Sequence, residues 1–259
     1  MVEDKLMPVM KENFLRNAHD TAFSPTGLYN FVDGNVTADS SGADPAKNLT
    51  ESESATNDSD FLPGSADGLS HFTLYRNNTN DFNYTGAMSY CCLINTSQFI
   101  PDSDNSHAVL GIYEGGASGS SLAQTVDARY AFQINNSGHL RYNHQTNSSS
   151  GTATNNLVTT DDKVRSLHEW QHAAFTRDSN GTGIKIYLDG ILIKSATLGA
   201  APGTHNTGTG FFAIGDIYNY NRTLTNSVII SSCAIYDQEL TANQIKYLAR
   251  KTLGYHRVN

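Results

Sequence analysis

The sequence has no surplus of positive charge and no long apolar run. No stretch approaches the roughly eighteen consecutive apolar residues that a helix needs to span a bilayer. The N-terminus carries charges at Glu3, Asp4 and Lys5 and has no uninterrupted apolar core, unlike a secretory signal. Lysine and arginine number 17 against 25 acidic residues, and the net charge is −8. Phosphate binding needs concentrated positive charge, so the sequence does not favour a nucleic-acid partner. Because it has no long apolar run, it does not favour membrane insertion either.

Cysteine is also scarce, because the 259 residues include only three: Cys91, Cys92 and Cys233. An odd and small number does not suit a disulfide framework. Cys91 and Cys92 are adjacent, and neighbouring residues of a strand point to opposite faces, so we do not expect them to pair with each other. The sequence therefore predicts buried free thiols in a protein made in a reducing cytoplasm.

The motifs of common catalytic sites are missing. There is no Glu-x-Asp-x-x-Glu pattern, which would supply the facing carboxylates of a glycosidase, and no Gly-x-Ser-x-Gly elbow. Phosphate loops and local Cys/His metal spacings are absent as well. Acidic residues gather between Glu51 and Asp60, in a polar stretch that is typical of a solvated loop. We therefore expect no enzymatic activity, no catalytic residues and no bound metal.

The most regular pattern in the chain lies in His168–Leu198. Residues 169–177 are rich in aromatic and apolar side chains, residues 184–188 alternate apolar and polar, and residues 191–198 alternate again. Asp189-Gly190 separates the last two segments and suits a two-residue hairpin turn. The stretch predicts three consecutive antiparallel strands.

The remaining chain predicts more short strands and one helix. Gly, Ser, Thr and Asn are abundant, and apolar alternation recurs about every ten residues, as in sandwiches and barrels. Residues 146–156 are polar and are expected to form a loop. Near the C-terminus, Thr241 and Gln244 have the spacing of a capping box, and Gly254 can end the helix that follows. The predicted fold is all-β: an antiparallel β-sandwich of jelly-roll type with a short C-terminal helix.

Several stretches in this order resemble the concanavalin A-like lectin/glucanase superfamily, in its laminin-G-like branch. The resemblance is carried by LYNFVDGNVTADSSG, EWQHAAFT, IKIYLDGIL, FFAIGD and VIISSCAIYDQELTANQI, and it covers residues 25–252. It implies a concanavalin A-like sandwich. Trp170 and His172 are part of the matching pattern, and we expect them to serve core packing and hydrogen bonding rather than ligand contact.

The resemblance also bears on calcium, which relatives hold with carboxylates. The family often has an acidic residue in the closing strand, where this chain has Ser231-Ser232. Asp33, Asp39 and Asp216 can offer oxygen ligands. However, an aspartate in a turn more often accepts hydrogen bonds from its own backbone, and Asp39 can do so in Asp39-Ser40-Ser41-Gly42. Calcium is therefore not part of the predicted site.

Binding needs fewer residues than catalysis. Asp216, Tyr218, Tyr220 and Asn221 place aromatic rings and hydroxyl-binding groups close together, which suits a glycan site. The same residue types suit a protein interface, where tyrosine is enriched, and both alternatives stay open.

These observations lead to one functional hypothesis and two alternatives. Bacteriophage capsid decorations and tail appendages often carry domains that this chain resembles, and by that analogy of fold the hypothesis is a non-enzymatic virion surface protein, with glycan adhesion as a further role. It divides the chain into an attachment leader, residues 1–24, and a sandwich, residues 25–259. Its partners are virion proteins, further copies of itself and cell-surface glycans. Its location is the virion, after synthesis in the host cytoplasm. The alternatives are a stand-alone carbohydrate-binding module and, less favoured, a glycoside hydrolase.

Overall fold

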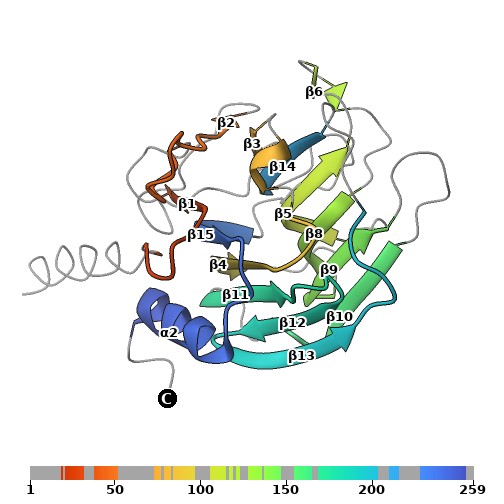
Figure 1. Cartoon of the computed structure of the whole chain (residues 1–259). Helices are drawn as coiled ribbons and strands as arrows, with labels where there is room; N and C mark the ends of the chain where they lie inside the picture. Colours follow the sequence, from red (N-terminus) through yellow and green to blue (C-terminus); the bar gives the residue numbers. More distant parts are fainter. Residues whose placement is uncertain are drawn as a thin grey trace, which may run out of the picture.

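A computed structural model shows two antiparallel sheets, one short hairpin and a C-terminal helix (Figure 1). The structure describes the following residues: 19, 21–31, 38–51, 73–76, 79–82, 84–96, 106–114, 117–118, 121–122, 128–135, 137–146, 155–164, 169–203, 210–215 and 228–254. The predicted all-β sandwich with a short C-terminal helix is confirmed. None of the helices in these ranges is long and apolar enough to span a membrane.

The first sheet has six strands. Their order across the sheet is β1 (Gly27–Asn30), β15 (Val228–Tyr236), β4 (Met88–Thr96), β11 (Trp170–Arg177), β12 (Gly183–Leu188) and β13 (Ile191–Thr197).

The second sheet has seven strands. Their order is β10 (Asn155–Lys163), β9 (His139–Gln145), β8 (Ala128–Asn135), β5 (Ser106–Glu114), β14 (Gly210–Gly215), β3 (Thr73–Arg76) and β2 (Thr50–Glu51). A 3₁₀ turn, η2 (Thr79–Phe82), precedes β4, and β6 (Ala117–Ser118) pairs with β7 (Ser121–Leu122).

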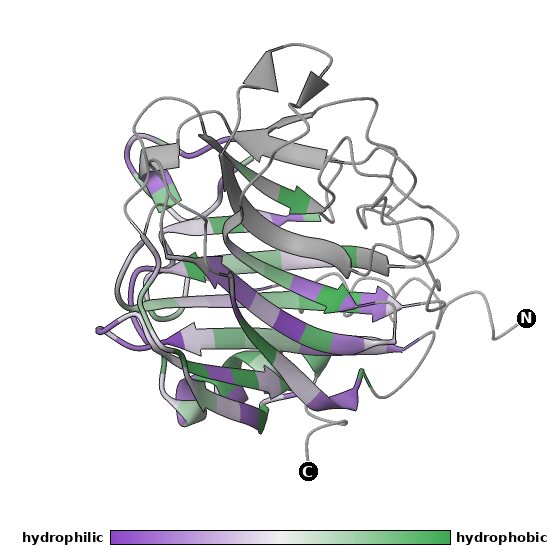
Figure 2. Ribbon diagram, turned by 90° about the vertical axis from the view of Figure 1, so that its right-hand side faces the viewer, coloured by the Kyte–Doolittle hydropathy of each residue, from purple (hydrophilic) through white to green (hydrophobic). Residues whose placement is uncertain are grey.

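The core between the two sheets is rich in aromatic rings. Phe175 of β11 lies 5.4 Å from Phe132 of β8 and 4.9 Å from Tyr142 of β9, measured between ring centroids. Tyr90 of β4 completes the group at 6.1 Å from Phe132. All four side chains are buried. Figure 2 shows the alternation of hydrophobic and hydrophilic residues along the strands that places such rings on the inner faces.

The outer face of the six-stranded sheet is covered by helix α2 (Ala242–Leu253). Ile245 and Leu248 of α2 pack on this face against residues such as Ala174 and Tyr187. The predicted capping box is present, since Thr241 accepts from the backbone of Gln244 and the Gln244 side chain accepts from the backbone of Thr241. The central strands β4 and β11 are thus buried on both faces, whereas the edge strand β13 is largely exposed.

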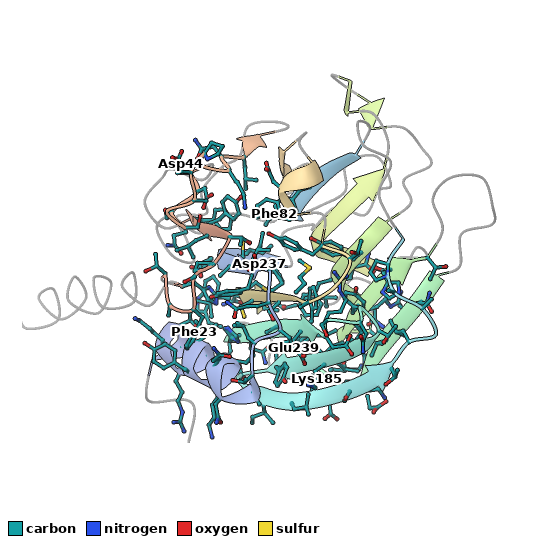
Figure 3. All side chains as sticks on the ribbon, viewed as in Figure 1. Phe23, Asp44, Phe82, Lys185, Asp237 and Glu239 are labelled. Carbon is teal, nitrogen blue, oxygen red and sulfur yellow. The ribbon has the colours of Figure 1, made fainter. Side chains whose placement is uncertain are left out.

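The predicted hairpin at Asp189-Gly190 joins β12 to β13. Both residues have positive φ, 52° for Asp189 and 78° for Gly190, as a type I′ turn requires. Near the other end of β12, Lys185 pairs with Glu239 at 2.7 Å, and both residues are labelled in Figure 3. The three-strand prediction for residues 168–198 is confirmed.

The prediction that residues 146–156 form a loop is wrong at its C-terminal end, because β10 begins at Asn155. Its sequence, NNLVTTDDK, has little apolar character, and Leu157 is exposed. The strand exists because it lies at the sheet edge and pairs with β9 from Asn155 to Thr159. Hydrogen bonding to a neighbour, rather than its own propensity, decides its structure.

The end of the predicted leader contacts the sandwich. Phe23 packs edge-on against Tyr247 of α2 at 5.5 Å, and its carbonyl accepts a hydrogen bond from Gln238 at 2.8 Å (Figure 3). Residues 1–18 lie outside the described residues. The division into a leader, 1–24, and a sandwich, 25–259, stays a prediction.

Candidate functional site

The residues predicted to bind glycans, Asp216, Tyr218, Tyr220 and Asn221, lie outside the described residues. The strands that flank them are described. In the six-stranded sheet, the first residue of β15, Val228, is the register partner of Thr96, the last residue of β4. The first residue of β11, Trp170, is opposite Asn95. Three strand ends therefore lie at one end of this sheet, which we call the loop end.

The second sheet ends on the same side. Residues 164–169 join the last residue of β10 to the first of β11. A chain of this length reaches at most about 25 Å. A nine-residue strand is about 30 Å long, so the connection cannot cross to the opposite end. Residues 97–105 and 216–227 are flanked by strand ends on this side as well.

Asp39, one of the residues weighed for calcium, accepts hydrogen bonds from backbone amides. Its Oδ1 accepts from the amides of Leu28 at 3.1 Å and Ser41 at 2.9 Å, and its Oδ2 accepts from the amide of Lys47 at 2.9 Å. The predicted bond to the amide two residues on is confirmed. Asp33 and Asp216 lie outside the described residues. The carboxylate of Asp39 thus holds β1 against its own turn.

Two further aspartates stabilise the turns on either side of β12. Asp178 accepts from the amide of Thr182 at 3.0 Å, and Asp189 accepts from the amide of His172 at 2.9 Å. These acids fix the β11–β12–β13 meander, which is a structural task rather than a catalytic one.

A cluster of metal-binding side chains lies buried on the outer face of the six-stranded sheet. His172 of β11, Leu93 of β4 and Ser232 of β15 are register partners in one row across three neighbouring strands. Cys91 lies two residues before Leu93 and therefore on the same face. His19, from the segment before β1, packs above this row, with its ring 5.3 Å from the ring of His172.

Three of these residues bring donor atoms together. One ligand atom from each of His19, Cys91 and His172 lies within 4.8 Å of the other two. Relative exposure is 2% for His19 and 0% for both Cys91 and His172. We call these three residues the donor cluster.

Ser232 and Asn30 hold His19 in place. The ring Nδ1 of His19 lies 2.8 Å from the hydroxyl of Ser232, and the amide of Asn30 donates to the carbonyl of His19 at 3.2 Å. Three ring nitrogens have no hydrogen-bond partner in the part of the chain that the structure describes: Nε2 of His19, and Nδ1 and Nε2 of His172. Unpartnered buried polar atoms call for an explanation, such as a bound water or ion.

Burial keeps both imidazoles of the cluster neutral. It lowers the pKa of His19 to about 3. Burial, followed by the neighbouring His19, holds the pKa of His172 well below its usual range. Burial also raises the pKa of the Cys91 thiol. A neutral imidazole presents one nitrogen lone pair, which is the form that binds metals.

The sequence did not indicate this cluster. Trp170 and His172 were expected to serve core packing and hydrogen bonding, and both are buried. The backbone of His172 is hydrogen-bonded to Asp189, but its two ring nitrogens have no hydrogen-bond partner among the described residues. No local spacing could reveal the cluster, since His19, Cys91 and His172 come from three distant parts of the chain.

The three cysteines are free and buried, as predicted. Cys92 and Cys233 are register partners whose side chains join the core between the sheets. Cys91 faces the opposite way, toward α2. Adjacent cysteines thus have different surroundings, which provides a matched pair for experiments.

The comparisons with known proteins agree with the architecture. A laminin-G family model, described as concanavalin A-like lectin/glucanases superfamily, matches residues 70–246. The chain belongs to this superfamily. Among curated proteins, none matches the chain.

Solved structures with a similar fold include receptor-binding domains of botulinum neurotoxins. The domain of neurotoxin D aligns with a TM-score of 0.58 at 14% identity over 89% of this chain and 53% of that one. A neurotoxin DC binding domain, solved in complex with rat synaptotagmin II, gives 0.58 at 14% over 88% and 52%. The serotype G domain gives 0.53 at 14% over 87% and 50%. This chain spans about half the length of those domains, and at such identity the likeness concerns the fold.

Proposed function

We propose that this lectin-like domain is a non-catalytic binding module on the surface of a bacteriophage virion, in a capsid decoration or tail appendage. It attaches to other virion proteins partly through its N-terminal segment and contacts cell-surface glycans through Asp216, Tyr218, Tyr220 and Asn221.

The observation that carries the binding role is the loop end. Strand ends that flank residues 97–105, 165–168 and 216–227 lie on one side of the sandwich, so variable connections can form one surface on a rigid support. Structures of similar fold include the receptor-binding domain of botulinum neurotoxin D, and the neurotoxin DC binding domain was solved in complex with rat synaptotagmin II. The virion setting rests on analogy of fold and on an acidic composition rich in Asn, Ser, Thr and Gly.

A glycan array tests the binding role. The double variant Tyr218→Ala/Tyr220→Ala is expected to lose at least tenfold in affinity for the glycans that the parent protein binds, because stacking on the apolar face of a sugar is removed. Tyr247→Ala is the matched control, since Tyr247 is an exposed tyrosine on α2 and does not belong to the β14–β15 connection. Equal binding by the double variant and the parent protein would reject the assignment of these residues.

Co-purification with particles tests the virion role. The proposal expects the protein in purified virions at a fixed ratio to other structural proteins. A protein that binds glycans but never co-purifies with virions would be a stand-alone carbohydrate-binding module instead.

A further inference from the structure

The donor cluster combines chemistry and burial in a way that hydrogen bonding within the protein does not explain. A neutral imidazole has one N–H donor and one acceptor nitrogen, and at 0% exposure neither nitrogen of His172 has a partner among the described residues. Leaving a buried donor or acceptor unsatisfied destabilises the folded state. His19 adds a third ring nitrogen without a partner among the described residues, and its ring centroid lies 5.3 Å from that of His172.

We propose that His19, Cys91 and His172 form a zinc site that fastens the N-terminal segment to the outer face of the six-stranded sheet. Two imidazoles and one thiolate are a typical donor set for Zn²⁺. The three ligand atoms already lie within 4.8 Å of one another. Tetrahedral zinc bonds of about 2.0–2.3 Å place ligand atoms roughly 3.4–3.6 Å apart. Side-chain rotations that move the ligand atoms by about 1 Å would therefore complete the site.

Ser232 prepares His19 for this role. When Nδ1–H of His19 donates to the Ser232 hydroxyl across 2.8 Å, Nε2 carries the lone pair. Nε2 is the nitrogen that lacks a partner. Metal-binding histidines commonly use the second ring nitrogen in this way, which fixes both the tautomer and the ring orientation.

Binding exchanges one proton for one metal ion. The Cys91 thiol loses its proton to solvent, and the resulting thiolate forms the Zn–S bond, while the two neutral imidazoles donate lone pairs without losing a proton. No oxidant or reductant takes part, and the buried site gains a charge of +1. The fourth position is filled by water or another oxygen donor.

The zinc site joins separate parts of the chain. Cys91 and His172 belong to neighbouring central strands, β4 and β11, whereas His19 precedes β1. The existing anchors of His19 are hydrogen bonds to Ser232 and Asn30 and the ring contact with His172. Zinc therefore adds a strong bond between the segment that leads into the sandwich and the centre of the sheet.

Refolding the full chain with Co²⁺ or Zn²⁺, followed by removal of free metal, tests the site. We expect about one Zn²⁺ per chain by mass spectrometry of the metal content. The Co²⁺ form should show thiolate-to-cobalt charge-transfer absorption and the visible bands of tetrahedral cobalt. Zinc should raise Tm by several degrees, because it binds the folded state.

Alanine variants of the two adjacent cysteines distinguish metal binding at the donor cluster from non-specific metal binding to thiols. Cys91→Ala should lose the charge-transfer band and most of the bound metal, whereas Cys92→Ala, equally buried but facing the other side, should keep both. His19→Ala removes a ligand that lies outside every strand. It gives a second reading if Cys91→Ala does not fold.

Three results would each overturn the proposal. The first is a wild-type protein that takes up less than about a tenth of one metal ion per chain. The second is equal loss of metal in Cys91→Ala and Cys92→Ala, and the third is full metal retention in His19→Ala. The glycan array and virion purification do not depend on zinc, so failure of this proposal and failure of the proposed function are distinguishable.

Discussion

Replacing Arg177 by methionine should destabilise the sandwich strongly. Arg177 ends β11 and is fully buried. Its guanidinium donates to the carbonyls of Tyr84 and Gly86, the latter at 2.7 Å, and to the hydroxyl of Tyr142 at 2.9 Å. It also lies over the ring of Tyr130, 5.5 Å from the centroid. One side chain thereby connects the inner face of β11 to the second sheet and to the segment before β4.

The size of the effect follows from what the substitution leaves behind. Methionine fills similar space but donates no hydrogen bond, so the carbonyls of Tyr84 and Gly86 lose this donor. A buried acceptor without a partner costs about 1–3 kcal/mol, and these two part-buried carbonyls lie toward the lower end of that range. The hydroxyl of Tyr142 lies 3.2 Å from Nδ1 of His144 and keeps that contact. Removing a buried cation also relieves its desolvation. We expect a net loss of about 3 kcal/mol, a large share of the 5–15 kcal/mol typical of a domain.

Urea unfolding, followed by the fluorescence of the single tryptophan, Trp170, measures this loss. With a slope of about 2 kcal/mol/M, the midpoint should fall by roughly 1.5 M. Arg177→Lys should lie between the parent and Arg177→Met, because an ammonium group cannot serve three separated acceptors. Lys194→Met is the control for a surface pair, since Lys194 contacts the exposed Asp161, and should cost about 0–1 kcal/mol. A change below about 0.5 kcal/mol in Arg177→Met would refute the reasoning.

Two further predictions concern pH and backbone geometry. Burial lowers the pKa of His144, whose Nε2 lies 2.8 Å from the carbonyl of Ala200, to about 4. Between pH 4 and its ordinary pKa of about 6.5, the unfolded chain binds a proton that the folded chain does not, so stability rises with pH in this window. Lowering the pH from 7 to 5 should therefore reduce the free energy of unfolding by about 2 kcal/mol through protonation of His144 in the unfolded chain. Urea titrations in which His144→Gln keeps the parent's dependence of stability on pH would contradict this prediction. Gly190→Ala should reduce the free energy of unfolding by about 2–3 kcal/mol, because φ is positive at 78° and the added Cβ would lie 2.9 Å from Cα of Lys246. Gly42→Ala should cost only about 1 kcal/mol, because its φ is also positive, at 81°, but its Cβ would meet open space. Equal losses in the two glycine variants would show that the contact with α2 does not matter.

Sequence patterns predicted the elements whose causes are local. The β11–β13 meander follows from apolar alternation and from Asp189-Gly190, a pair that adopts positive φ easily. Helix α2 follows from the capping box at Thr241 and Gln244. The strand β10 was missed because its residues have little strand character, and pairing with β9 determines its conformation.

The donor cluster, unlike these elements, could not be predicted from local sequence patterns. Local features of the sequence predicted the two-sheet architecture, the buried free cysteines and the hydrogen bonds of Asp39 to nearby backbone. Apolar alternation and short-range hydrogen bonds involve residues that are close together in the chain. His19, Cys91 and His172 come together only in the folded chain. Their meeting depends on the strand order β1-β15-β4-β11 and on the packing of the N-terminal segment over that face, which are properties of the whole chain.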